Sequence, residues 1–172
     1  MMKRTVLAIL AAAILFGAAA TVATAQLPKE SEAQKALRLN WWTEARFGMF
    51  IHWGLYALPA RHEWVKNRER LTNEQYRKYF EMFDPDLYNP REWAKMTKAA
   101  GMKYAVLTTS HTSGFLLWDS PTSEFGVANS ASKTDVVKAF VDECRRYDII
   151  PGLYYCMWGG PKYPTAKRVE RR

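Results

Sequence analysis

Two histidines in this sequence lie where apolar, strand-like segments end. His52 lies near the end of the segment 47–53, and His111 directly follows the segment 104–110. If both segments are parallel strands, their carboxyl ends meet at one edge of the sheet, and the two imidazoles converge there. The other candidates, which lie in the loop after the first segment or within a third such segment, are Glu63, Trp64, Tyr154 and Tyr155.

These residue types are suited to a sugar site. An aromatic face stacks on the apolar face of a pyranose, while histidine and glutamate form directional hydrogen bonds with its hydroxyl groups. A metal site is not indicated, because the chain has only three histidines and His62 stands beside Glu63 without a partner at a metal-ligand spacing. A single histidine in a strand is more often a packed core residue than a functional one. The position of two histidines at the ends of successive strands favours a functional role. We expect neither a metal nor a cofactor.

The elements that must position these side chains alternate between strand and helix. Thr72 and Gln75 have the spacing of a capping box, and Asn89, Pro90 and Gly101 have the types and positions of a helix start and stop. An apolar stripe from Val136 to Cys144 marks the last helix. The sequence predicts strands at 47–53, 104–110 and 150–157, the first of them buried, and helices at about 72–83, 90–100 and 135–147.

Strands alternating with helices predict an α/β fold. An open doubly wound sheet is one solution, but no glycine-rich phosphate loop follows the first strand. The placement of His52 and His111 at the carboxyl ends of successive strands favours a barrel, whose active site lies at that edge. We therefore predict the N-terminal portion, about three βα units, of an incomplete (β/α)8 TIM-type barrel.

Several motifs resemble α-L-fucosidases of glycoside hydrolase family 29. Residues 46–56 read R-F-G-M-F-I-H-W-G-L-Y, residues 107–115 read L-T-T-S-H-T-S-G-F, and 152–155 read G-L-Y-Y. The resemblance covers about residues 40–158. It implies a (β/α)8 catalytic domain and retaining hydrolysis of terminal α-L-fucosides. It also implies that the fucose pocket is lined by His52, Glu63, Trp64, His111 and one of Tyr154 and Tyr155.

The sequence departs from the family pattern in one motif. The family's T-T-K-H-H-[DE]-G-F has a lysine, a second histidine and an acid where this chain has Ser110, Thr112 and Ser113. Thr112 can donate a hydrogen bond but carries no charge. The contact to one sugar hydroxyl is therefore expected to differ.

Retaining glycosidases need two carboxyl groups, a nucleophile and an acid/base. The resemblance implies that both follow later strands, beyond Arg172, so neither Glu63 nor Asp119 is assigned these roles. We accordingly expect a truncated, inactive form of an exported fucosidase. Two alternatives stay open: a non-catalytic sugar-binding protein built from the same half-site, and a fragment without a stable fold.

The N-terminus has the layout of a secretory signal. Lys3 and Arg4 precede an apolar run from 6 to 20, and Ala23-Thr24-Ala25 then matches a cleavage site. We expect residues 1–25 to be removed on export and 26–172 to form the catalytic-domain portion, without stable membrane association. The net charge of +8 owes much to a basic tail at 161–172, for which we expect solvation and not nucleic-acid binding. The expected partner is a fucosylated glycan or glycoside.

Overall fold

The computed structural model describes residues 29–157, which belong to two compact units divided between Leu39 and Asn40. Helix α2 (Glu32–Ala45) begins in the first unit and ends in the second. It starts with a reciprocal pair of hydrogen bonds: the Ser31 N–H donates to Gln34 Oε1, and the Gln34 N–H donates to Ser31 Oγ. Helix α2 buries none of its residues. The predicted signal sequence and the basic tail at 161–172 lie outside the described residues. Within the described part, no helix is long and apolar enough to cross a membrane.

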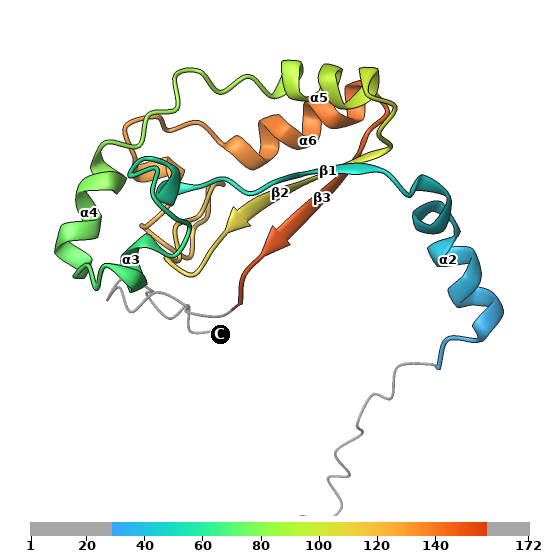
Figure 1. Cartoon of the computed structure of the whole chain (residues 1–172), viewed down its shortest axis with the longest axis horizontal. Coiled ribbons are helices and arrows are strands. Elements are labelled where there is room, and N and C mark those ends of the chain that lie inside the picture. Colours follow the sequence, from blue (N-terminus) through green and yellow to red (C-terminus); the bar gives the residue numbers. More distant parts are fainter. Residues whose placement is uncertain (1–28, 158–172) are drawn as a thin grey trace, which may run out of the picture. The chain divides into compact units, whose positions relative to one another are not determined.

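The second unit is built on a parallel sheet of three strands. These are β1 (Gly48–Ile51), β2 (Tyr104–Ser110) and β3 (Ile150–Tyr155), in the order β1-β2-β3. Figure 1 shows the strands side by side. The register pairs Gly48 with Tyr104 and Tyr104 with Ile150, so the strands start level and their carboxyl ends point to the same edge. The α/β prediction is confirmed.

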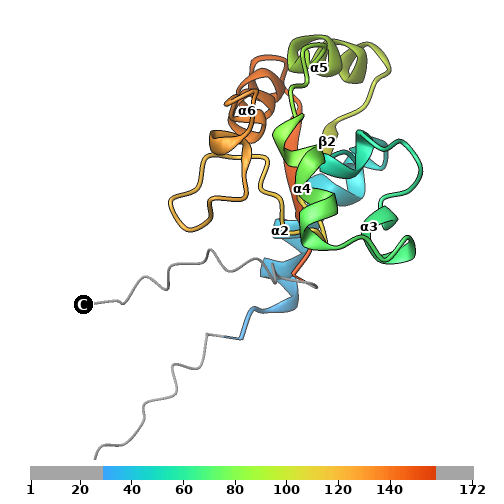
Figure 2. The ribbon, with the colours of Figure 1, turned by 90° about the vertical axis from the view of Figure 1, so that its left-hand side faces the viewer.

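The two crossover helices cover one face of this sheet. Helix α5 (Pro90–Ala99) leads into β2, and α6 (Val136–Arg146) leads into β3. They pack against each other on the same side of the strands (Figure 2). Helices α3 (Val65–Arg68) and α4 (Asn73–Glu81) lie instead beyond the carboxyl ends of the strands (Figure 1). The long β1–α5 connection, which contains both helices, therefore contributes structure at that edge of the sheet.

The helix boundaries follow the predicted capping signals. Gln75 N–H donates to Thr72 Oγ1, and Thr72 N–H donates to Gln75 Oε1, which confirms the capping box of α4. Asn89 Oδ1 accepts from the Glu92 N–H at the start of α5. Gly101 follows α5 with φ of 77°, a left-handed conformation that favours glycine.

The first strand differs from its prediction in length and in burial. It covers four residues, and Phe47 and Phe50 are 54% and 55% exposed. The reason is that β1 is an edge strand and the crossover helices cover only one of its faces. Phe50 lies on the other face, where its ring contacts Tyr154 with centroids 5.7 Å apart. The prediction of a strand buried throughout was wrong.

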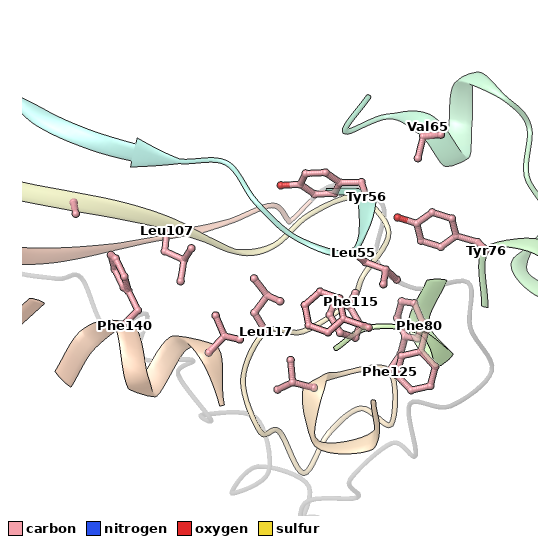
Figure 3. Close-up of a cluster of buried hydrophobic side chains, with 14 of the residues drawn as sticks. Leu55, Tyr56, Val65, Tyr76, Phe80, Leu107, Phe115, Leu117, Phe125 and Phe140 are labelled. Carbon is pink, nitrogen blue, oxygen red and sulfur yellow. The ribbon is translucent and has the colours of Figure 1, made fainter. Parts of the chain in front are cut away.

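The core lies between the sheet, α6 and α4 (Figure 3). Leu107 of β2 and Phe140 of α6 point toward one another, and Val136 and Cys144 complete the buried stripe of α6. A second part of the core is aromatic and lies next to α4. Its rings, which contact one another at centroid distances of 4.9–6.0 Å, are Phe80, Phe83, Phe115 and Phe125. Cys144 and Cys156 are not joined by a disulfide in the described part of the chain.

Candidate functional site

His52 and Tyr56 are placed together by the chain that leaves β1. His52 directly follows Ile51, the last residue of the strand, and a single 3-10 turn (η1, Leu55–Ala57) then returns Tyr56 toward it. Tyr56 Oη lies 2.8 Å from His52 Nδ1, which is a hydrogen bond. The Tyr56 ring is buried in the core, and its packing there fixes the position of the hydroxyl group. This local structure fixes the orientation of the His52 ring.

His111 lies in a tight turn at the carboxyl end of β2. The Gly114 N–H donates to the His111 carbonyl over 2.8 Å, and Gly114 has a φ of 77°, which only glycine adopts at little cost. The next residue, Phe115, is buried among the aromatic rings of the core. The turn is therefore anchored on both sides, by the strand before it and by Phe115 after it.

The imidazole of His111 is the centre of a cluster of rings. His52 lies edge to face with it, with centroids 4.9 Å apart and an interplanar angle of 74°. Tyr56 and Trp64 make similar contacts with His111 at 5.3 Å and 5.4 Å. Although these residues come from two strands and from the start of α3, they converge at one place, as the spacing of the histidines predicts.

A cavity of about 460 Å³ opens beside this cluster. His52 and Glu63 line it, and Tyr56 contributes part of the wall. The remaining lining residues, all from the loop that precedes α3, are Ala57, Ala60, Arg61 and His62. A volume of this size accommodates a monosaccharide, and the lining combines hydrogen-bonding groups with small apolar ones.

The Glu63 carboxylate can accept a hydrogen bond from a ligand. Its Oε2 atom lies 3.1 Å from His62 Nδ1, but the same nitrogen accepts a hydrogen bond from the Trp64 N–H over 2.8 Å. A neutral imidazole nitrogen that accepts a hydrogen bond carries no proton. Because His62 Nδ1 accepts from the Trp64 N–H, it does not donate to Glu63, and the carboxylate can accept from a hydroxyl group in the cavity.

The two best-placed polar rings favour their neutral forms. Burial lowers the pKa of His111, the proximity of His52 lowers it further, and Glu63 opposes the shift. Burial raises the pKa of Tyr56 far above its ordinary value, and the nearby Thr108 hydroxyl opposes that rise. At neutral pH the site therefore presents a neutral imidazole at His111 and a protonated phenol at Tyr56. Neutral hydrogen-bonding groups of this kind fit a neutral polyol.

The side chains of Tyr154 and Tyr155, which are adjacent in β3, lie on opposite faces of the sheet. Tyr154 lies on the His52 face, with ring centroids 6.2 Å apart. Tyr155 points the other way, because successive side chains of a strand alternate, and its ring contacts Trp118 at 6.1 Å. Tyr155 lines a separate, largely apolar cavity of about 440 Å³ with Trp118 and Leu153. The structure thus brings His52, Glu63, Trp64, His111 and Tyr154 together and leaves Tyr155 apart.

This geometry can be set beside known proteins. A family model described as alpha-L-fucosidase matches residues 14–171. The chain belongs to the alpha-L-fucosidase family. The tissue alpha-L-fucosidase of Homo sapiens is 32% identical over 186 residues, covering 94% of this chain and 40% of that protein. That of Macaca fascicularis is 33% identical over 148 residues, covering 75% and 32%.

Solved alpha-L-fucosidase structures have a similar fold over the part that this chain matches. The isoenzyme 1 from Paenibacillus thiaminolyticus shares 49% identity with a TM-score of 0.68, covering 69% of this chain and 28% of that one. A glycoside hydrolase family 29 enzyme from Bacteroides thetaiotaomicron, described as a trapped covalent intermediate, shares 32% identity with a TM-score of 0.64, over 66% and 28%. The chain spans about a third to two fifths of the length of the first curated relatives it matches.

The residues that depart from the fucosidase motif lie around His111. Ser110 and Ser113 are buried, and the Ser110 backbone carbonyl accepts from the Cys156 N–H over 3.1 Å. Thr112 is half-buried, with Oγ1 3.3 Å from His111 Nδ1. The hydroxyl group of Thr112 therefore interacts with His111 where the family motif has a second imidazole.

Sequence reasoning overlooked Tyr56 as a functional residue. It lies within the motif at 46–56, but nothing in the residue pattern separates it from the core tyrosines. The available signal was its position only four residues after His52, because a turn of the chain can bring side chains so close in sequence together.

Proposed function

We propose that this chain supplies the fucose-binding half of the active site of an exported α-L-fucosidase. The observation that carries the proposal is a cavity lined by His52 and Glu63, beside which the rings of His52, His111 and Trp64 come together. Hydrogen-bond donors and acceptors at fixed positions can distinguish sugars by the arrangement of their hydroxyl groups, while an aromatic ring contacts the C–H face of the sugar. Tyr154 extends the aromatic wall beside His52.

The arrangement of the sheet supports a barrel of the (β/α)8 type. A strand order that follows the sequence, with both crossover helices on one face, extends naturally by further units of the same kind. A doubly wound sheet would instead reverse its strand order and place helices on both faces. The exposed side of the strands carries His52, Phe50 and Tyr154, which in a barrel would face its interior.

The chemical step needs groups in addition to those of this pocket. Retaining hydrolysis uses two carboxyl groups about 5–5.5 Å apart, and among the described residues that line the cavity only Glu63 has a carboxylate. We therefore assign Glu63 to binding and not to nucleophilic attack. The relative from Bacteroides thetaiotaomicron was trapped as a covalent intermediate with 2-fluoro-fucosyl fluoride, which supports a retaining mechanism for the complete enzyme.

Export is the second part of the proposal. It is supported by the basic, apolar and small-residue succession at residues 1–25, with cleavage after Ala25. The chain would then meet fucosylated glycans outside the cytoplasm. Sequencing of secreted material should begin at Gln26; retention of Met1 on a membrane-bound product would contradict this part.

Calorimetric titration tests the binding proposal directly. L-fucose should bind the chain with a Kd of about 1 mM, as expected for a few hydrogen bonds and one ring contact, and D-fucose, its mirror image, should bind at least tenfold more weakly. Equal affinity for the two enantiomers would contradict a built fucose site.

Hydrolysis of an aryl α-L-fucoside separates the enzyme from the non-catalytic alternative. With a single carboxylate in the described pocket, the chain should bind L-fucose without turnover above a blank. If the chain is part of a fucosidase, a polypeptide carrying the C-terminal two thirds of a relative should restore turnover when coexpressed with it. Binding that persists while no such pairing ever produces turnover would favour the sugar-binding alternative.

A further inference from the structure

The hydrogen bond between Tyr56 and His52 can be formed in two directions. Either the phenol donates to an unprotonated Nδ1, or a protonated Nδ1 donates to the phenol oxygen; the distance of 2.8 Å fits both. The direction matters because it determines the other nitrogen. If Nδ1 accepts, neutral His52 carries its proton on Nε2 and offers a donor there; if Nδ1 donates, Nε2 is an acceptor.

The surroundings of Tyr56 favour donation by the phenol. The side chain is 6% exposed, so a hydroxyl proton without an acceptor would be left unsatisfied. Among the described residues, His52 Nδ1 is the only acceptor within hydrogen-bond geometry of this hydroxyl group. Thr108 Oγ1 is close enough to influence the pKa of Tyr56, but it is buried without a hydrogen-bond partner among the described residues.

The ionisation of Tyr56 is consistent with this direction. Burial raises the pKa of its phenol, so the group retains its proton throughout the physiological pH range and is always able to donate. His52 is held in place by further ring contacts with His111 and Tyr154, at 4.9 Å and 6.2 Å. These contacts favour the orientation in which Nδ1 faces the Tyr56 hydroxyl group.

We propose that Tyr56 is a positioning residue that holds His52 as its Nε2–H tautomer, so that His52 acts as a hydrogen-bond donor toward the sugar. This inference rests on the proposed function for the identity of the ligand, but the tautomer itself is a property of the free chain. The consequence is a division of roles in the pocket: His52 donates to a hydroxyl oxygen, while the Glu63 carboxylate accepts from a hydroxyl proton.

Long-range ¹H–¹⁵N NMR of the ¹⁵N-labelled chain tests the tautomer. The chain has only three histidines, so His52 is assigned by comparison with a His52→Gln variant. At about pH 8, above the ordinary histidine pKa of about 6.5, His52 should show an unprotonated Nδ1 and a protonated Nε2. A protonated Nδ1 in the unmodified chain would overturn the proposal without any variant being needed.

The Tyr56→Phe variant tests whether the phenol causes the preference. Its His52 should become a mixture of tautomers, and its affinity for L-fucose should fall about 3- to 10-fold, the range for one net hydrogen bond. Tyr88→Phe is the matched control, because Tyr88 is a partly buried tyrosine whose hydroxyl donates to the Val136 carbonyl over 2.8 Å. An unchanged His52 tautomer in Tyr56→Phe would contradict the proposal. A correct tautomer in a chain that fails to bind L-fucose would uphold the role of Tyr56 and overturn the sugar assignment.

Discussion

The imidazole rings of His52 and His111 lie edge to face with their centroids 4.9 Å apart, at the ends of two neighbouring parallel strands. Neither strand alone makes a pocket. Their pairing in register brings the two rings to the same edge of the sheet, and the loop that follows β1 adds Glu63 and Trp64. The site is thus a direct product of the parallel topology.

Removing either histidine should weaken sugar binding. His52→Ala deletes a hydrogen-bonding group that lines the cavity, and His111→Ala deletes one in the ring cluster beside it. Each loss corresponds to roughly 1–3 kcal/mol, or about 5- to 150-fold in the Kd for L-fucose. Calorimetry provides the measurement, and Leu87→Ala, at a position that is 90% exposed, is the control. Wild-type affinity in both histidine variants would remove these residues from the site.

The stability of the chain should depend on the ionisation of His111. Because its pKa is lowered in the folded state, the unfolded chain binds more protons on acidification, and the free energy of unfolding falls as the pH drops through about 6.5. The loss levels off once the pH is below the folded-state pKa. Thermal melts at pH 8 and pH 5 should therefore differ less in a His111→Gln variant than in the unmodified chain. An identical pH dependence would show that His111 does not contribute.

Phe115, which follows the turn that carries His111, should contribute strongly to the stability of the core. It is 2% exposed and contacts the rings of Phe80, Phe83 and Phe125. Phe115→Ala should lower the free energy of unfolding by about 3–5 kcal/mol, and Phe115→Leu, which leaves a smaller void, by less. Urea denaturation measures both. Nearly equal losses of under 1 kcal/mol would mean that this aromatic cluster is not a tightly packed core.

The turn at Gly114 offers a matched pair of glycine substitutions. Gly114 and Gly101 both have a φ of 77°, but only Gly114 lies in the turn that carries His111. Alanine at either position should destabilise the chain by about 1–2 kcal/mol, because a Cβ disfavours the left-handed conformation. Only Gly114→Ala should also shift the NMR signals of His111 and weaken L-fucose binding. Equal effects of both variants on binding would show that the turn does not position His111.

The parts of the fold that could be predicted are those specified locally. The caps at Thr72 and Asn89 and the stripe from Val136 to Cys144 depend on neighbours within one helix, and they are found as expected. The convergence of His52 and His111 followed from strand parallelism alone. Helices α2 and α3 were not foreseen, because neither has a strong apolar stripe: α2 buries no residue and α3 spans a single turn.

Other features depend on tertiary structure. The sequence could not tell which of Tyr154 and Tyr155 faces the site, because both faces of β3 carry apolar residues and only the sheet's orientation decides. Similarly, the apolar run around Phe50 was expected to be buried because its pattern is that of an interior strand. The Phe50 side chain is exposed because the crossover helices cover only the other face of the sheet, and the composition of the strand does not show which face they cover.

The crystal structure of the chain with L-fucose tests the central claim most directly. We predict that the sugar occupies the cavity beside His52 and Glu63, with hydroxyl oxygens within about 3 Å of His52 Nε2 and of the His111 ring, and with its C–H face against Trp64. A parallel experiment with D-fucose should leave the cavity without sugar. L-fucose bound elsewhere on the chain, with this cavity unoccupied by sugar at saturating concentration, would contradict the account.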